Sequence, residues 1–190
     1  ADLTEIFDSE LLGEGLLPTL RDAIGRLLKP NARVIPASAT IFAQVVECPT
    51  LAQYSPDSIA AATAASLGRQ LAAAEAPRQP NPLTAGASFE MHVDALTDLR
   101  PLSAPFEVFT FDLSAPPAGN GDVAIEVKVS QSGIVHAVVS WWALQMDPLD
   151  PHNVVCTTPS YLARSGWSAS ATAKSVEDSA GQSEANQAQS

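Results

Sequence analysis

The sequence predicts an α+β chain in which a short strand, a loop and a helix precede a series of antiparallel strands. Two observations carry this prediction. Apolar residues recur at helical spacing between residues 19 and 29, and from residue 89 onward they recur at alternate positions. Several alternating strands in succession favour a sheet that curls into a barrel or a sandwich. At 190 residues the chain has room for one domain with its own core, followed by a tail.

A short apolar run opens the chain, and an acidic loop follows it at residues 8–15. Leu3, Ile6 and Phe7 are typical of a buried parallel strand. The loop ends in GEG at residues 13–15. These glycines suit a tight backbone turn better than a phosphate site, because phosphate-binding motifs need a longer glycine pattern. We therefore expect a strand, then a loop, then a helix.

One amphipathic helix is predicted after this loop. Thr19 and Asp22 have the spacing of a capping box at its start, and Lys29 and Pro30 suit its end. Its apolar face comprises Leu20, Ala23, Ile24, Leu27 and Leu28. Residues 34–35 indicate a second short strand.

Three later stretches favour strands. Residues 40–47 are β-branched and apolar, and apolar side chains alternate over residues 109–113. They alternate again over residues 123–129, and the turn signal at residues 131–133 then predicts a hairpin with residues 134–142. Within the last stretch Trp141 and Trp142 point to opposite faces of a strand.

The segment from residue 49 to about 87 reads as an insertion between strands. Asp57 and Ser58 can cap an alanine-rich helix that runs to about Glu75, and the prolines at 77, 80 and 82 then break the chain. From Ser168 onward the sequence is polar and of low complexity, so we expect a disordered tail.

Charge and composition limit the classes of partner. A formal charge of -11 argues against nucleic acid or an anionic membrane, and no apolar run approaches the ~20 residues that a bilayer crossing needs. Cys48 and Cys156 suggest neither a disulfide framework nor a metal site, so we expect a cytoplasmic or nuclear protein. His92, His136 and His152 lack metal-ligand spacing and are expected to be structural.

Two glutamates are the candidate site. Glu5 lies near the carboxyl end of the first predicted strand, where ligands bind in open α/β sheets. Glu14 follows nine positions later between two glycines, so a tight reversal can return its carboxylate toward Glu5. Such a pair fits a cation, and a planar guanidinium matches carboxylates better than an ammonium does. Acidic loop residues are more often solvated surface groups, and we expect Asp8 and Glu10 to face solvent.

Five segments resemble the protein arginine methyltransferase family, in the form of its arginine methyltransferase 7 branch. TEIFDSELLGEG at residues 4–15 resembles the double-E loop of these enzymes. ARVIP (32–36) and ATIFAQVVE (39–47) resemble the last core strand of these enzymes passing into their first barrel strand. FTFDL (109–113) and VVSWWALQMDP (138–148) resemble later strands of the same barrel. The resemblance spans residues 2 to about 160. It implies the end of a Rossmann-like methyltransferase core at residues 1–36, a β-barrel domain at residues 37–165 and a tail at residues 166–190.

The resemblance implies roles for both glutamates. Glu5 and Glu14 would bind and orient a substrate arginine while S-adenosylmethionine donates a methyl group to the guanidinium. The branch is associated with omega-N monomethylation of arginine in proteins such as histones. An arginine-containing protein is therefore the expected partner, and association with a second methyltransferase unit is possible.

The sequence also departs from the family pattern. The glycine-rich donor loop would lie upstream of Ala1, and Trp167 lacks the neighbouring histidine of a later family loop. We therefore expect the chain alone to bind the donor poorly and to be inactive. Residues 49–87 occupy the place of the family's dimerisation arm, but their alanine-rich sequence does not resemble it.

Two other functions remain open at this point. The chain could be a non-catalytic binding or assembly module from a degenerate methyltransferase. The acid pair could instead serve a glycoside hydrolase, although such clefts are usually lined with aromatic residues and the region from Glu5 to Gly15 has only Phe7.

Overall fold

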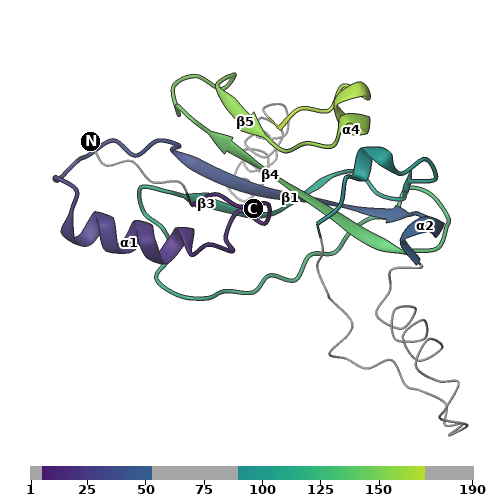
Figure 1. Cartoon of the computed structure of the whole chain (residues 1–190), viewed down its shortest axis with the longest axis horizontal. Helices are drawn as coiled ribbons and strands as arrows, with labels where there is room; N and C mark the ends of the chain where they lie inside the picture. Colours follow the sequence, from purple (N-terminus) through teal and green to yellow (C-terminus); the bar gives the residue numbers. More distant parts are fainter. Residues whose placement is uncertain (1–5, 53–89, 170–190) are drawn as a thin grey trace, which may run out of the picture. The chain divides into compact units, whose positions relative to one another are not determined.

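The computed structural model describes residues 6–52 and 90–169 (Figure 1). Their elements, in order, are α1 (Leu16–Arg26), β1 (Ser38–Glu47), α2 (Pro49–Ala52), η1 (Val93–Ala95), β2 (Arg100–Pro101), β3 (Phe106–Asp112), β4 (Ala137–Gln145), β5 (Val154–Cys156) and α4 (Ser160–Arg164). Contacts divide the chain into two compact units. The first comprises Ala1–Ala43, Pro105–Val127 and Ser140–Ser190, and the second comprises Gln44–Ala104 and Lys128–Val139. Within the described ranges no helix is long and apolar enough for a membrane crossing.

The strands form an antiparallel sheet in the order β2-β1-β4-β5, with β3 also paired to β1. Strand β1 has the sequence SATIFAQVVE, whose β-branched and apolar residues suit a largely buried strand. Its first half pairs with β3, from Ser38 opposite Asp112 to Ala43 opposite Phe106, and its last two residues pair with β2. The strands predicted over residues 40–47 and 109–113 are therefore confirmed.

The core of the first unit lies under the acidic loop and α1. Its buried members are Leu11, Leu16, Ala39, Phe111, Leu113 and Leu144. Burial of a leucine or phenylalanine side chain of this kind contributes ~1.5–3 kcal/mol. Because Leu11 and Leu16 both belong to this cluster, the four residues between them are anchored at each end.

The adjacent tryptophans of β4 pack in different surroundings. Trp141 is 3% exposed and lies in an aromatic cluster with Phe42 and Trp167, with ring centroids 5.1–6.1 Å apart. Trp142 packs instead against the core that contains Leu11. The two side chains therefore lie on opposite faces of the strand, as predicted.

Helix α1 begins and ends earlier than predicted. The expected capping box is wrong, because the N-cap is Gly15 and no side chain caps the helix. Thr19 lies inside the helix, where its N–H donates to the Gly15 carbonyl. Asp22 instead pairs with Arg26 one turn later. The helix ends before Leu27, which is 61% exposed and so does not belong to a buried apolar face.

The predicted hairpin over residues 123–142 is also wrong. Strand β4 is present, but its neighbours are β1 and β5, so no pairing with residues 123–128 forms. Val129 makes only an isolated bridge to Ser103, and the Ser130 N–H donates to the Leu102 carbonyl at 2.7 Å. The Gln131 N–H, in the expected turn, also donates to the Leu102 carbonyl at 3.4 Å, so the start of this turn bonds to the segment that follows β2.

Two predicted short strands are not found. Ile6 and Phe7, the described part of the first, and residues 34–35 are not in strands. Ile6, Phe7 and Val34 are nevertheless partly buried against the core, so their apolar character reflects packing rather than sheet pairing. The predicted helix at residues 57–75 lies outside the described residues, as does the tail beyond residue 169.

Candidate functional site

The acidic loop follows directly on the start of the described chain and leads into α1. Its backbone is turned by hydrogen bonds from the Leu11 N–H to the Asp8 carbonyl and from the Gly15 N–H to the Leu12 carbonyl, both 3.1 Å. Leu11 adopts a φ of 71°, an unfavourable value for a leucine, and it is fully buried. Burial of this side chain in the core compensates for that conformation, so the loop has a defined shape.

Trp142 of β4 binds this loop through its indole nitrogen. Nε1 donates to the Asp8 carbonyl at 3.1 Å and to the Ser9 carbonyl at 3.2 Å. The Trp142 backbone N–H is itself bonded to the Thr157 hydroxyl at 3.1 Å. A strand residue more than 130 positions away in sequence therefore fixes the first turn of the acidic loop.

Asp8 does not face solvent, which corrects the sequence expectation. The residue is half-buried, and its Oδ1 is buried with no hydrogen-bond partner among the described residues. A Cβ placed on Gly13 would lie 2.0 Å from the other carboxylate oxygen, so the absence of a side chain at Gly13 makes room for Asp8. The loop thus folds around an inward carboxylate. Glu10 is exposed, in agreement with the expectation for it.

Glu14 lies at the far end of the loop and is exposed. The next residue, Gly15, has φ 78° and ψ 35°, a left-handed conformation that glycine adopts without strain. Helix α1 starts at once with Leu16, so Glu14 adjoins a helix N-terminus, where negative side chains are favoured. Glu5 lies outside the described residues. The proximity of Glu5 and Glu14 therefore stays a prediction.

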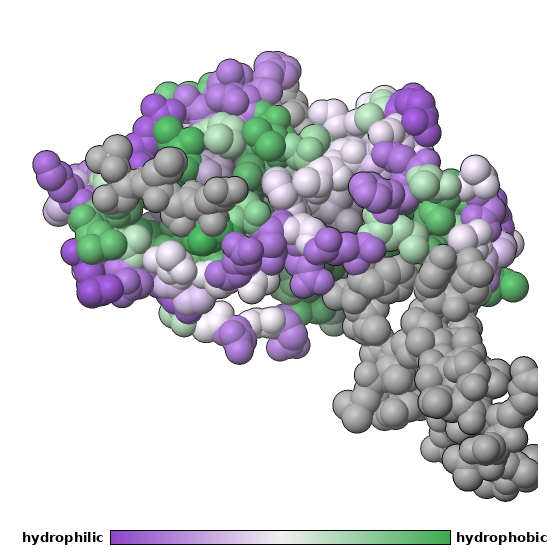
Figure 2. Space-filling view, viewed as in Figure 1, coloured by the Kyte–Doolittle hydropathy of each residue, from purple (hydrophilic) through white to green (hydrophobic). Residues whose placement is uncertain are grey.

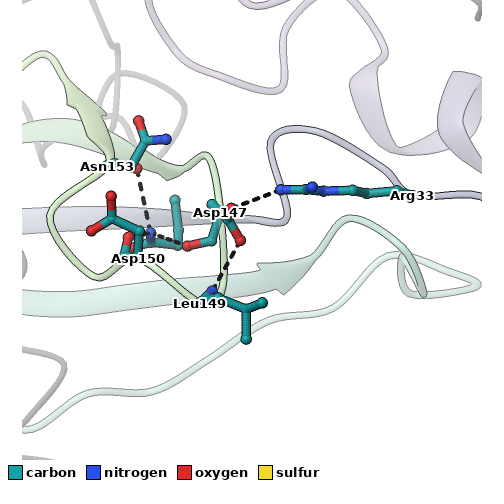
Figure 3. A network of polar contacts seen from close by, with 6 residues as sticks. Arg33, Asp147, Leu149, Asp150 and Asn153 are labelled. Carbon is teal, nitrogen blue, oxygen red and sulfur yellow. Dashed lines mark hydrogen bonds and ion pairs between the residues drawn. The ribbon is translucent and has the colours of Figure 1, made fainter.

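An ion pair connects the segment after α1 to the turn between β4 and β5 (Figure 3). Arg33 donates to the Asp147 carboxylate at 2.8 Å, and the other oxygen of that carboxylate accepts the Leu149 N–H at 3.0 Å. The Leu149 N–H and Arg33 together lower the pKa of Asp147. The Asp147 carbonyl in turn accepts the Asp150 N–H. These contacts order the turn. Arg33 and Asp147 are 114 residues apart in sequence, so no local sequence pattern predicts their ion pair.

The second unit has a separate polar cluster at the end of β1. The buried Cys48 thiol donates to Asp98 at 3.1 Å, and Asp98 also accepts the Thr50 N–H at 2.8 Å. Burial, reinforced by Asp98, raises the pKa of Cys48. The Cys48 N–H donates to Nδ1 of His136 at 3.0 Å. This contact gives His136 a structural role, as predicted.

Of the two predicted site carboxylates, the described residues include Glu14, which is exposed at the end of the loop. Sequence reasoning found this residue but missed the parts that shape the loop, namely Trp142 and the packing of Asp8 against Gly13. A strand tryptophan carries no signal of its hydrogen-bond acceptors. A glycine pair in a turn signals flexibility, whereas Gly13 is needed for close approach of a side chain.

Most of the chain matches a known family. Residues 37–171 match the family described as the arginine methyltransferase oligomerization subdomain. A Protein arginine N-methyltransferase 7 from Oryza sativa subsp. japonica is 40% identical over 146 residues, which cover 76% of this chain and 20% of that protein. Proteins of the same name from Aedes aegypti and Danio rerio are 36% and 33% identical, over 76% and 82% of this chain and 21% and 22% of their own lengths.

The chain thus spans about a fifth of the length of the curated relatives it matches. The family match covers the described antiparallel strands, and these three relatives carry the name to which the loop and strand segments point. The resemblance stated from the sequence is confirmed: the chain belongs to the protein arginine methyltransferase family.

Proposed function

We propose that this chain is part of an S-adenosylmethionine-dependent protein arginine N-methyltransferase and supplies Glu5 and Glu14 as the carboxylates that bind the substrate arginine. The observation that carries the proposal is the sequence and the fixed backbone of the acidic loop. Its sequence resembles the double-E loop, and Trp142 and the turn at Gly15 fix its backbone at both ends. A fixed loop supports the role because a carboxylate must be positioned before it can orient a guanidinium.

The two carboxylates would act by binding and orientation. A guanidinium offers a planar set of N–H donors, so each of two edges can bind one carboxylate with two in-plane hydrogen bonds. The pair would hold the cation, select which nitrogen faces the donor, and stabilise the positive charge that remains until a proton leaves. S-adenosylmethionine, the co-substrate of the family, would supply a sulfonium methyl group, and we assign no residue of this chain to it. The proposed product is omega-N-monomethylarginine in proteins such as histones.

A chimera tests the proposal. Residues 1–190 replace the matching segment of the Oryza sativa relative, and methyl transfer to an arginine-rich peptide is measured. We expect an active chimera in which Glu5→Gln or Glu14→Gln lowers kcat/KM on the order of 100-fold or more, as loss of a group that stabilises transition-state charge does. Glu10→Gln is the matched control, because it removes an exposed carboxylate from the same loop and should change kcat/KM little. Equal losses in all three variants would contradict the assignment.

A second candidate function is a non-catalytic assembly module, which the description of the matched family as an oligomerization subdomain favours. In that case the chimera would stay active when Glu5 and Glu14 are replaced. We expect the isolated chain to transfer no methyl groups, and the same peptide assay on residues 1–190 checks this. Robust turnover by the isolated chain would show that it binds the donor itself.

A further inference from the structure

Asp8 is a half-buried carboxylate of the acidic loop that the proposed mechanism does not use. Charged side chains normally stay in water, and Figure 2 shows hydrophilic residues spread over the face of the chain that it views. Glu10 and Glu14 follow this pattern, whereas Oδ1 of Asp8 is buried with no hydrogen-bond partner in the described chain. A buried carboxylate oxygen without a donor is costly, so a chain that keeps one is expected to gain something from its position.

The backbone of Asp8 is held from two sides. Its carbonyl accepts the Leu11 N–H at 3.1 Å and the indole N–H of Trp142 at 3.1 Å. The Trp142 backbone N–H is in turn bonded to the Thr157 hydroxyl at 3.1 Å. All of these residues belong to the first compact unit. The Asp8 side chain therefore extends from a backbone position that strand β4 fixes.

From this position the Asp8 carboxylate crosses the inside of the loop and packs against Gly13. A Cβ placed on Gly13 would lie 2.0 Å from Oδ2 and 3.1 Å from Cγ of Asp8, so the carboxylate occupies the space that a side chain there would need. Gly13 directly precedes Glu14. The contact therefore joins the start of the loop to the residue that carries Glu14 at its end.

Few other contacts hold the backbone at Glu14. Within the described chain, neither the Gly13 N–H nor the Glu14 N–H donates a hydrogen bond. The next one along the chain runs from the Gly15 N–H to the Leu12 carbonyl at 3.1 Å. Gly13 also has no side chain to restrict its own backbone. Removal of the Asp8 carboxylate would therefore leave residues 13 and 14 with open space on the inner side of the loop and more accessible conformations.

We propose that Asp8 is a positioning residue for Glu14. Its inward carboxylate supports Gly13 from inside the loop and so confines the Glu14 carboxylate to the position that receives the substrate guanidinium. The role rests on the proposed function of Glu14, and Asp8 itself contacts neither substrate nor donor. A displacement of about 1 Å in a reacting pair can slow a reaction about 100-fold, so the effect of Asp8 should fall on kcat.

Methyl transfer by the chimera that carries residues 1–190 tests this role. Asp8→Ala should lower kcat at least about tenfold and change KM less than about twofold, because the guanidinium still binds a Glu14 that is less well placed. Asp8→Asn should keep kcat within about threefold of the native value, since an amide fills the same space without the charge. An asparagine variant as slow as the alanine variant overturns the packing role, and so does an alanine variant with native kcat.

Two double variants show whether the effect passes through Gly13 and Glu14. In the Glu14→Gln chimera, Asp8→Ala should cause little further loss, because no carboxylate is left to position; a full tenfold further loss, to about a tenth, would overturn the route. In the Asp8→Ala chimera, Gly13→Ala places a methyl group in the vacated space and should raise kcat about threefold or more. No recovery overturns the contact as the route.

The single variants separate this proposal from the proposed function. Unchanged kcat/KM in Glu14→Gln would defeat the methyltransferase role of Glu14. A large loss in Glu14→Gln together with native kcat in Asp8→Ala would defeat only the positioning role. Asp8→Ser, whose side chain is too short to reach Gly13, replaces Asp8→Ala in every comparison if the alanine variant misfolds.

NMR relaxation of the backbone amides measures the support without any activity, in the 190-residue chain itself. The order parameters of the Gly13 and Glu14 N–H groups should lie near about 0.85 in the native chain and in Asp8→Asn, and should fall toward about 0.6 in Asp8→Ala. Order parameters that Asp8→Ala leaves unchanged overturn the proposal, whether or not the chimera is active.

Discussion

Replacement of Gly133 by alanine is expected to destabilise the second unit. A Cβ on Gly133 would lie 2.6 Å from Nη2 of Arg100, 2.7 Å from Oε2 of Glu47 and 2.8 Å from Cδ2 of Leu102. Arg100 and Glu47 form an ion pair, and Arg100 also donates to the Ser132 carbonyl at 3.0 Å. The substitution therefore forces three neighbours apart at once.

The magnitude follows from these contacts. To reach even 3.0 Å, the three atoms must move by 3.0 − 2.6 = 0.4 Å, 3.0 − 2.7 = 0.3 Å and 3.0 − 2.8 = 0.2 Å. Leu102 is fully buried, so its Cδ2 can shift only together with the side chains packed around it, whereas the Arg100 side chain is 45% exposed and can move toward solvent; most of the cost therefore falls on Leu102. Insertion of a methyl group into a packed site costs ~1–3 kcal/mol, and the loss of glycine flexibility in the unfolded chain offsets ~0.4–1 kcal/mol of that. We expect a net loss of about 1–2 kcal/mol.

Urea denaturation of the full chain measures this effect, with Gly25→Ala as the matched control. No atom lies within 4 Å of a Cβ on Gly25, which is in α1, so the same substitution should stabilise by up to ~1 kcal/mol. The cost at Gly133 should also fall in an Arg100→Ala background, because one of the three close contacts is then gone. If Gly133→Ala proves as stable as the native chain, the packing argument is wrong.

Three further predictions concern the acidic loop and the cluster at the end of β1. Gly13→Ala should lower the free energy of unfolding by ~1–3 kcal/mol in urea titrations, because the added Cβ meets the Asp8 carboxylate. This loss should vanish when Asp8 is also replaced by alanine, and an equal loss in both backgrounds would contradict the contact. Trp142→Phe keeps an aromatic side chain but removes the indole N–H and part of the packed ring, so stability should fall by at least about 1 kcal/mol and limited proteolysis should cut the loop faster. Unchanged cleavage would show that the hydrogen bonds do not hold the loop. The hydrogen bond from Cys48 lowers the pKa of Asp98. The stability that ionised Asp98 contributes is therefore present above the unfolded pKa of ~3.9 and is lost as pH falls through the folded pKa. Asp98→Asn should flatten the fall in stability below about pH 4, and a pH profile identical to that of the native chain would refute this.

The sequence predicted those elements in which local pattern and final environment agree. Strand β1 was found because its β-branched and apolar residues suit a buried strand wherever it pairs. Strand β3 was found for a similar reason, since Phe109 and Phe111 alternate with polar residues and both pack on the core. The presence of a helix after the acidic loop was predicted from its apolar spacing.

The remaining errors have a common cause, which is competition between local signals and distant partners. Thr19 and Asp22 have the spacing of a capping box, but Leu16 is buried in the core and the helix begins there, with Gly15 as its N-cap. Residues 123–129 have the pattern of a hairpin strand, but both neighbours of β4 are other strands. Local sequence carries no information about either competitor.

The candidate site was predictable only in part for the same reason. The type and spacing of Glu5 and Glu14 are local properties, and family resemblance gave them a role. The inward position of Asp8 depends on the missing side chain at Gly13, and the shape of the loop depends on Trp142. Neither dependence can be read from residues 4–15 alone.

The indole of Trp142 also sets the order in which the chain can mature during synthesis. Asp8 and Ser9 are synthesised 134 and 133 residues before the tryptophan that donates hydrogen bonds to their carbonyls. At ~5–20 residues per second the interval lasts roughly 7–27 s. Leu11 lacks Phe111 of β3 for most of that time and Leu144 of β4 for all of it, so its apolar side chain stays accessible to chaperones until the sheet is complete.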